Sequence, residues 1–560
     1  MTTIAMPQRP LTRCAIPAAP IFMGLDFSTQ GLKATFIDAA GQVLAEPSVL
    51  FDTDLPEFKT EGGVHRHADG LTVTAPPIMW VAALDLLLAR MQKKNLPLAK
   101  VAAISGSGQQ HGSVYLRRGT RSRLGALDSR LTLRDQFRDM FSFDAAPVWM
   151  DSSTSRQCRE RDAALGGAQA VAELTGSRSY ERFTGNQIAK IYQQHPEAYA
   201  ATDHIALVSS FTASLLIGTY APIEPGDGAG MNLMNIHTRR WAPAALHCTA
   251  PGLAKRLGRI VPSHKVIGRL SRYFTDRYGF APHTQVVAFS GDNPNSLAAL
   301  GLARSGDIAI SLGTSDTFFG ALSAPNPSAA EGHIFGNPIN PQGYMALICY
   351  KNGSLTRELV RNEFARGSWK VFEAALARTP AGNGGRIGFY FKEPEITPTV
   401  LTPGIYRFGP DERPAGFTPD QNVRAVVEGQ YISMRLHGNN IGLVPQKILA
   451  TGGASVNRSL LQVMADVFGT PVHVSSQPNS ASLGAAYRAL HGWHCARARR
   501  FVPFAKVVRA AASFTTAVEP DRVMHRLYTA MLARYAELEK RVIPISAQSV
   551  RGQGRDISGA

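Results

Sequence analysis

Two short hairpin patterns with the same layout, far apart in the chain, most constrain how this sequence can fold. The first, residues 21–44, reads IFMGLDFSTQGLKATFIDAAGQVL, and the second, residues 307–322, reads DIAISLGTSDTFFGAL. In each pattern, the apolar residues of two strands flank a tip that contains glycine and hydroxyl side chains. We therefore expect two related domains whose hairpin tips face one ligand.

The length of the chain agrees with this organisation. The chain has 560 residues, which is too long for one hydrophobic core. We expect an α/β fold in which residues 21–302 form an N-terminal domain and residues 303–545 a C-terminal domain. Residues 1–20 contain four prolines and are expected to be a flexible leader, whereas residues 546–560 are expected to be a disordered tail.

The charge balance narrows the choice of partners. The 59 Lys and Arg residues outnumber the 42 Asp and Glu residues, which gives a net charge of +17. Such a surplus suits nucleic acid, but it also suits an anionic nucleotide substrate. The sequence has no zinc-finger spacing and no RNA-binding signature. We therefore expect no nucleic-acid partner, although basic residues concentrate at 117–138 and 497–500.

The cysteines and the hydropathy pattern indicate the cellular compartment of the protein. The five cysteines are an odd number and include no Cys-x-x-Cys pair, which is typical of free thiols in a reducing compartment. No stretch is long and apolar enough to span a bilayer. We expect a cytoplasmic protein without a membrane partner, either a monomer or a homodimer.

One carboxylate stands where a short strand meets a helix. In VVAFSGDNPNSLAAL, residues 286–300, an apolar run precedes Asp292, and Pro294 suits the first turn of a helix. An isolated Asp-x-Pro is most often a helix N-cap. The alternative is that the carboxylate faces a cleft and does chemistry there, and the remaining motifs bear on that choice.

The hairpin tips offer groups that suit a phosphate. The first tip carries Asp26, a carboxylate suited to hydrated Mg²⁺, together with Ser28 and Thr29. The second tip carries Thr314 and Ser315. Singly, each tip is more often a plain turn. Together they favour a nucleotide cleft, although the sequence contains neither a Walker lysine loop nor a dinucleotide fingerprint.

Two further turns follow apolar strands. The motif TGGAS brings Gly452 and Gly453, whose missing side chains let a flat purine or a sugar lie against the backbone. The motif ISGSGQQHGSVYL places two glutamines and His111 at the end of a strand, where they suit a polyhydroxylated ligand. A plain strand-to-helix turn and a structural histidine are the respective alternatives.

Helical spacing is clear in three segments. We expect helices over 76–94, over 419–439 with Asp420 as its cap, and over 519–542. Residues 117–143 are charged and poor in apolar pattern, so we expect a loop or an insertion there.

Eight stretches together make the chain resemble the FGGY carbohydrate kinases. They are DFSTQ, SGSGQQHGS, PVWMDSST, LTGSRSYERFTGNQIAKIYQQHPEAY, SGDNPNSLA, ISLGTSDT, KNGSLTRE and ILATGGASVNR, and the resemblance as a whole runs from about Met23 to Val542. The resemblance implies an actin-like fold of two ribonuclease-H-like domains, with ATP and a sugar in the cleft between them. It also implies that Asp292 is the general base for the sugar hydroxyl.

The same resemblance assigns roles to other residues of this sequence. The sugar-contacting positions are His111, Arg182, Asp292 and Asn293. Asp26 would hold Mg²⁺ through water, and the phosphates would be lined by Ser28, Thr29, Thr314 and Ser315. The adenosine side would be formed by Gly452, Gly453, Asn457 and Trp369. For Trp369, a place in the core is an equally good interpretation.

The chain departs from the family pattern at one position. Many bacterial members carry Trp-x-Asp-x-Arg near the sugar, whereas VWMDSSTSR has Ser153 at the place of the arginine. The resemblance offers Arg182 as the replacement guanidinium. The departure argues against glycerol or gluconate as the substrate.

Within the family, the chain looks like the animal enzymes that phosphorylate D-xylulose. The expected reaction is therefore transfer of the ATP γ-phosphate to D-xylulose, which gives D-xylulose 5-phosphate. Ribulose, ribitol or another ketopentose is an alternative substrate. A chaperone ATPase would need an appended peptide-binding domain, and a sugar-responsive regulator an N-terminal helix-turn-helix. A catalytically silent sugar-binding protein is disfavoured because both Asp26 and Asp292 are present.

Overall fold

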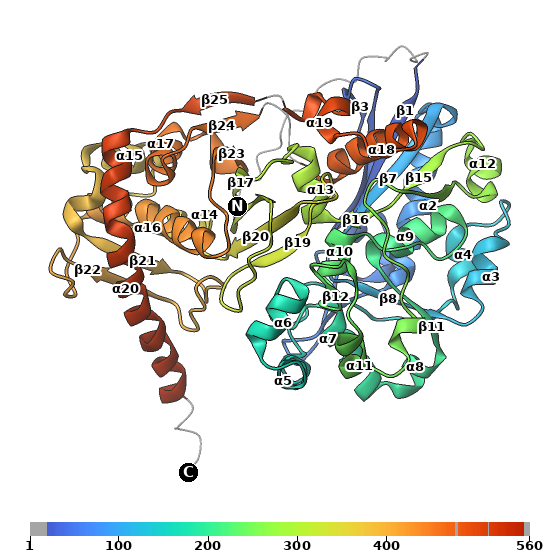
Figure 1. Cartoon of the computed structure of the whole chain (residues 1–560), viewed down its shortest axis with the longest axis horizontal. Helices are drawn as coiled ribbons and strands as arrows, with labels where there is room; N and C mark the ends of the chain where they lie inside the picture. Colours follow the sequence, from blue (N-terminus) through green and yellow to red (C-terminus); the bar gives the residue numbers. More distant parts are fainter. Residues whose placement is uncertain (1–18, 476–479, 513, 554–560) are drawn as a thin grey trace, which may run out of the picture.

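The chain folds into two α/β lobes. The computed structural model describes residues 19–475, 480–512 and 514–553. The N-terminal lobe, blue to green in Figure 1, lies beside the C-terminal lobe, which is yellow to red. Most of the predicted leader lies outside the described residues. Among the described helices, none combines the length and the apolar character needed to cross a membrane.

Each lobe contains a central sheet with the same strand order. The N-terminal sheet contains β1 (Ile21–Phe27), β2 (Gly31–Ile37), β3 (Val43–Ala45), β7 (Val101–Gly108) and β15 (Gln285–Val287). The C-terminal sheet contains β17 (Asp307–Leu312), β18 (Asp316–Leu322), β20 (Tyr344–Tyr350), β23 (Lys447–Thr451) and β24 (Val472–Ser475). In the N-terminal sheet these strands lie in the order β3-β2-β1-β7-β15, and in the C-terminal sheet in the order β20-β18-β17-β23-β24. In each of these orders, the first two neighbouring pairs are antiparallel and the last two are parallel. The duplicated topology predicted from the hairpins is therefore confirmed.

The parallel strands of the N-terminal sheet end at a common edge. Strands β1 and β7 run side by side with Asp26 next to Ser107, and β16 (Ser290–Gly291) pairs with the end of β7. Helix α13 (Asp292–Ala299) starts directly after β16. Because parallel strands present their carboxyl ends at one edge, residues far apart in sequence meet there.

One helix from the C-terminal part of the sequence packs on the N-terminal lobe. Helix α18 (Ala481–Ala498) contacts β1, β7 and α13, and Figure 1 shows it beside the blue strand β1. The contact is close at Gly24, where a Cβ atom would lie 2.0 Å from the carbonyl oxygen of Ser482. A division of the chain at residue 302 therefore assigns α18 to one lobe by sequence, whereas it packs on the other.

Of the two expectations for residues 117–143, a loop or an insertion, the loop is wrong. The segment forms helices α3 (Thr120–Gly125) and α4 (Leu133–Phe137) and strand β9 (Phe141–Phe143). Leu124, Leu133 and Phe137 are buried. Each element is only one or two turns or a few residues long, so its apolar side chains do not recur often enough to give a readable period.

The three helices predicted from their spacing are present, with differences at their ends. Helix α2 spans Pro77–Lys93, α16 spans Pro419–Asn440, and α20 spans Arg522–Gln553. The cap of α16 is Thr418, not Asp420, because Thr418 and Gln421 form a reciprocal capping box. Helix α20 continues into the segment predicted as a disordered tail, and residues 554–560 lie outside the described residues.

Candidate active site

Asp292 is the first residue of α13 and does not cap it. The N-cap is Gly291, and a Cβ atom there would lie 2.3 Å from Cγ of Gln110. The Oδ1 atom of Asp292 accepts hydrogen bonds from the backbone N–H of Asn293 at 2.8 Å and from its side-chain amide at 3.1 Å. Burial raises the pKa of Asp292 to about 6, although the backbone N–H groups of Asn293, Gln110 and Asp292 itself favour its charged form.

A second carboxylate, Asp26, lies within electrostatic reach of Asp292. The pKa of Asp26 is raised to about 7, first by burial and then by the negative charge of Asp292, although Ser107 and Lys33 act in the opposite direction. Its Oδ1 atom is buried and has no hydrogen-bond partner among the described residues. Two neighbouring carboxylates of this kind favour the approach of a cation.

The predicted polar strand end lies beside this pair of carboxylates. Gln110 accepts a hydrogen bond from the side-chain amide of Asn293 at 2.9 Å. In the described part of the chain, neither amide atom of the buried Gln109 has a partner, nor does Nε2 of Gln110. Buried polar atoms are normally paired, so a cluster of unpaired ones is typical of a surface that binds a polar ligand.

His111 is fixed in its neutral form. Its Nδ1 atom lies 2.7 Å from the carbonyl oxygen of Gly230, and because a carbonyl can only accept, Nδ1 carries the proton. Burial lowers the pKa of His111 to about 3, and the charge of Arg182 adds to this effect. The ring packs on Phe183, with the centroids 4.5 Å apart. Nε2 is therefore left as a hydrogen-bond acceptor.

Arg182 and Ser153 have different hydrogen-bond partners, and Ser153 stands at the position of the arginine in the bacterial pattern. The hydroxyl of Ser153 accepts a hydrogen bond from Nζ of Lys190 at 2.6 Å. Arg182 instead donates a hydrogen bond of 2.7 Å to Nε2 of His333, a residue of the C-terminal lobe. Trp149, in the same motif, donates to the hydroxyl of Thr29 at 2.8 Å.

Two buried acids near Asp292 were not anticipated from the sequence. Asp227 is 2% exposed, and its Oδ1 atom has no partner among the described residues. Burial holds the pKa of Asp227 well above its usual range, and the charges of Glu224 and Asp292 add to the shift. The hydroxyl of Ser290 donates a hydrogen bond to Glu224. The glycine-rich stretch EPGDGAG, residues 224–230, carries both acids and was the available signal.

The second hairpin tip is exposed and rigidly supported. Thr314 and Ser315 are exposed, and Asp316, the next residue, is fully buried. Arg357 donates to both carboxylate oxygens of Asp316, at 2.7 and 3.0 Å. This buried bidentate ion pair holds the base of the tip. At the first tip, Ser28 instead donates within its own turn, to the carbonyl oxygen of Gly31 at 3.0 Å.

The four residues predicted on the adenosine side lie near the second tip or near one another. Gly452 has a φ of +83°, and a Cβ atom there would lie 2.6 Å from the carbonyl oxygen of Leu312, which precedes the tip. Next to Gly453, Asn457 caps α17 (Arg458–Phe468) and donates to Glu373 at 2.7 Å. Trp369 starts α15 (Trp369–Arg378), and Glu373 lies one turn later in the same helix. Trp369 is 36% exposed, so the alternative of a core tryptophan is wrong.

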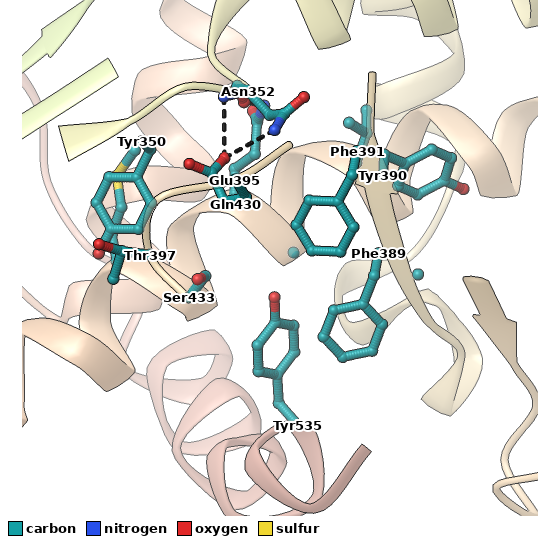
Figure 2. A pocket seen from close by; sticks show the side chains of 14 residues that line it. Tyr350, Asn352, Phe389, Tyr390, Phe391, Glu395, Thr397, Gln430, Ser433 and Tyr535 are labelled. Atoms are coloured by element: carbon teal, nitrogen blue, oxygen red, sulfur yellow. Dashed lines mark hydrogen bonds between the residues drawn. The ribbon is translucent and has the colours of Figure 1, made fainter. Parts of the chain in front are cut away.

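A small cavity in the C-terminal lobe lies near the base of the second hairpin tip, where Tyr350 pairs with Asp316. It has a volume of about 40 Å³ and is lined by Tyr350, Phe389, Phe391, Ser433 and Tyr535, among others. In Figure 2 the hydroxyl of Tyr535 points into it, and Asn352 on its rim is held by Glu395. This volume has room for a few water molecules but not for a nucleotide.

The predicted site residues thus form two groups, one on each lobe. The first group, at the edge of the N-terminal sheet, contains Asp26, Ser28, Thr29, His111, Arg182, Asp292 and Asn293. The second group contains Thr314, Ser315, Trp369, Gly452, Gly453 and Asn457. In the described part of the chain, no hydrogen bond joins the two groups directly. The two lobes share one strand order, and this duplicated ribonuclease-H-like architecture places the chain in the actin-like class of two-lobed proteins.

The comparisons with known proteins give the family. Residues 142–301 match the N-terminal domain, and residues 308–493 the C-terminal domain, of the FGGY family of carbohydrate kinases. The chain is 50% identical to the xylulose kinase of Mus musculus over 546 residues, or 97% of each chain. It is 46% identical to xylulose kinase 2 of Arabidopsis thaliana, over 90% of this chain and 92% of that protein. The chain belongs to the FGGY family of carbohydrate kinases.

Solved structures confirm the fold but do not select a sugar. The crystal structure of xylulose kinase from Rhodospirillum rubrum has a TM-score of 0.77 at 17% identity, and covers 94% of this chain and 100% of that one. Gluconate kinase from Lactobacillus acidophilus has a TM-score of 0.76 at 18% identity, and covers 95% of this chain and 100% of that one. Because both kinases match equally well, only the sequence similarity distinguishes between the sugars.

Proposed function

We propose that this protein transfers the γ-phosphate of ATP to D-xylulose and forms D-xylulose 5-phosphate. The observation that carries the proposal is the 50% identity to a xylulose kinase over 97% of both chains. The alternatives of a silent sugar sensor or a chaperone ATPase lack any comparable support. A kinase for another ketopentose or pentitol is the remaining alternative within the family.

The chemistry at the sugar begins with Asp292 as the general base. The hydroxyl that attacks the phosphorus must lose its proton, and the carboxylate of Asp292 offers an acceptor at the strand edge. A carboxylate is basic enough because phosphoryl transfer passes through a loose transition state, in which alignment matters more than base strength. The hydrogen bonds from Asn293 to Oδ1 fix the direction of the carboxylate.

The other sugar-side residues bind and orient the substrate. The Nε2 atom of His111 is an acceptor and takes a hydrogen bond from a sugar hydroxyl. Arg182 donates to sugar oxygens, and Asn293, whose side-chain N–H groups are held by Gln110 and Asp292, offers its amide oxygen to a sugar hydroxyl. These groups hold the reacting hydroxyl next to Asp292, and such positioning accounts for much of the catalysis of a bimolecular transfer.

Asp26 fits a hydrated Mg²⁺ ion. Its buried Oδ1 atom has no partner among the described residues, and one carboxylate with phosphate oxygens and water is the usual set of magnesium ligands. The ion neutralises the charge of the ATP phosphates when it is bound. Ser28, Thr29, Thr314 and Ser315 line those phosphates, while Gly452, Gly453, Asn457 and Trp369 hold the adenosine.

The pH dependence of kcat/KM follows from the pKa of Asp292. The base acts only when it is deprotonated, and its pKa in the free protein is raised to about 6. The value of kcat/KM for the sugar is therefore expected to rise with pH through about 6 and to level off above about pH 7. Steady-state rates between about pH 5 and about pH 8 check this, and a flat profile over that range would contradict the role of Asp292.

A substrate panel tests the proposed function. ADP release with Mg²⁺-ATP is measured with D-xylulose, D-ribulose, L-xylulose, D-fructose, glycerol and gluconate. We expect D-xylulose to have the highest kcat/KM. A higher kcat/KM for another polyol would support a kinase with a different substrate. Binding of a sugar without any ADP release would favour a catalytically silent sugar-sensing protein.

We also propose a cytoplasmic protein that acts as a monomer or a homodimer. The location is supported by the state of the cysteines, because Cys158, Cys248, Cys349 and Cys495 are free thiols in the described part of the chain.

A further inference from the structure

The sugar side of the site is in contact with the C-terminal lobe through one strand. Strand β19 (His333–Gly336) belongs to the C-terminal sheet. Its residue Ile334 donates a backbone hydrogen bond of 2.9 Å to the carbonyl oxygen of Gly176 in the N-terminal lobe. A Cβ atom at Gly176 would lie 2.3 Å from the carbonyl oxygen of Ile334, so the two backbones touch. The segment that follows Gly176 carries Arg182.

Within this contact, the imidazole of His333 lies between two side chains of the N-terminal lobe. The Nη2 atom of Arg182 lies 2.7 Å from Nε2, and the hydroxyl of Ser177 lies 3.2 Å from Nδ1. A guanidinium can only donate, so Nε2 is the acceptor. In the neutral ring the proton is then on Nδ1, which donates to Ser177.

The surroundings of His333 keep its ring neutral. The side chain is 4% exposed and packs between the rings of Tyr180 and Phe183, at centroid distances of 4.8 and 5.2 Å. Burial holds the pKa of His333 well below its usual range, and the positive charge of Arg182 lowers it further. The ring therefore remains an acceptor for Arg182 throughout the neutral pH range.

The same aromatic rings connect Arg182 to His111. The guanidinium of Arg182 lies over the ring of Tyr180, 5.0 Å from its centroid, and Phe183 packs on His111. In the described part of the chain, the bond to His333 is the one hydrogen bond that the guanidinium makes. Its other N–H groups are thus available to a ligand beside His111.

We infer that His333 is a positioning residue, contributed by the C-terminal lobe, that orients Arg182 toward the sugar. The inference rests on the proposed function, in which Arg182 contacts the sugar. None of the motifs that carry the family resemblance contains His333. Strand β19 lies in the same sheet as the second hairpin tip, which faces the nucleotide. Through His333, this strand holds Arg182, which binds the sugar.

Two substitutions of His333 separate positioning from packing. In His333→Gln, the side-chain amide reaches the place of Nε2 and can still accept from Arg182. In His333→Asn, the amide reaches only the place of Nδ1, so it can bond to Ser177 but not to Arg182. Loss of one charge-assisted hydrogen bond is expected to raise the KM for D-xylulose about ten- to hundredfold in His333→Asn. We expect the KM for ATP and the melting temperature of the two variants to agree, and His333→Gln to stay within about threefold of the unaltered protein in its KM for D-xylulose.

A double-mutant cycle with Arg182→Ala shows whether His333 acts through Arg182. If it does, adding His333→Asn to Arg182→Ala raises the KM for D-xylulose no further. The inference is overturned if the Asn and Gln variants have the same KM, or if His333→Asn has its full effect without Arg182. An unchanged KM in Arg182→Ala itself would remove the proposed sugar contact and this inference with it. A raised KM in Arg182→Ala together with an unchanged one in His333→Asn would remove only the inference.

Discussion

The Asp292→Asn variant is expected to lose most of its turnover, with kcat reduced by about 10²- to 10⁴-fold, while D-xylulose and ATP still bind. Asparagine has the shape of aspartate, and its carbonyl oxygen can keep the hydrogen bond from the backbone N–H of Asn293. What it lacks is an acceptor for the proton of the attacking hydroxyl. The effect should therefore appear in kcat and not in binding.

The measurements are initial rates of ADP release and the dissociation constant of D-xylulose by calorimetry. Asp227→Asn is the matched control, because it makes the same change at another buried acid that interacts electrostatically with Asp292. We expect the kcat of this control to stay within about tenfold of the unaltered protein. A kcat for Asp292→Asn that is no lower than that of the control would rule out Asp292 as the base.

The local parts of the site could be predicted from the sequence because each is encoded in a few adjacent residues. The tips that begin at Asp26 and Gly313 are bounded by alternating apolar residues, and the strand end before Asp292 is marked by Gly291 and Pro294. A strand that ends in glycine must turn there, so the polar residue that follows lies at the sheet edge. That edge gathers Asp26, Asp292 and the glutamines around His111.

The contacts between distant segments could not be predicted in this way. Nothing near His333 in the sequence indicates that it bonds to Arg182, 151 residues away. The acids of residues 224–230 are visible in the sequence, but their place under Asp292 depends on the packing of α10 (Pro225–Ala229) against β16. The short elements of residues 117–143 could not be predicted for a different reason. Their burial depends on the segments that pack around them, and each is too short to show a hydrophobic period.

Helix α18 is the clearest case of a contact that the sequence does not reveal. Its apolar residues indicate a buried helix, but not the lobe on which it packs. The structure shows glycines where α18 meets its neighbours on the N-terminal lobe: Gly24 in β1 faces Ser482, and Gly484 in α18 faces α13. The position of α13 matters for function, because Asp292 is its first residue.

Gly484→Ala is accordingly expected to destabilise the protein and to reduce its activity, although alanine is the better helix former by about 1 kcal/mol. A Cβ atom at Gly484 would lie 1.8 Å from the carbonyl oxygen of Asn295, which is backbone and has no side-chain freedom to move away. Overpacking costs up to about 3 kcal/mol, and a contact with backbone lies at the upper end of that range, so packing outweighs helix propensity. We expect the midpoint of thermal unfolding to fall by roughly 3 °C, and kcat to fall with it as α13 shifts. Gly416→Ala is the control, because a Cβ atom there would meet nothing within 4 Å. If Gly484→Ala melts at or above the temperature of that control, helix propensity decides the outcome and α18 does not press on the helix that carries Asp292.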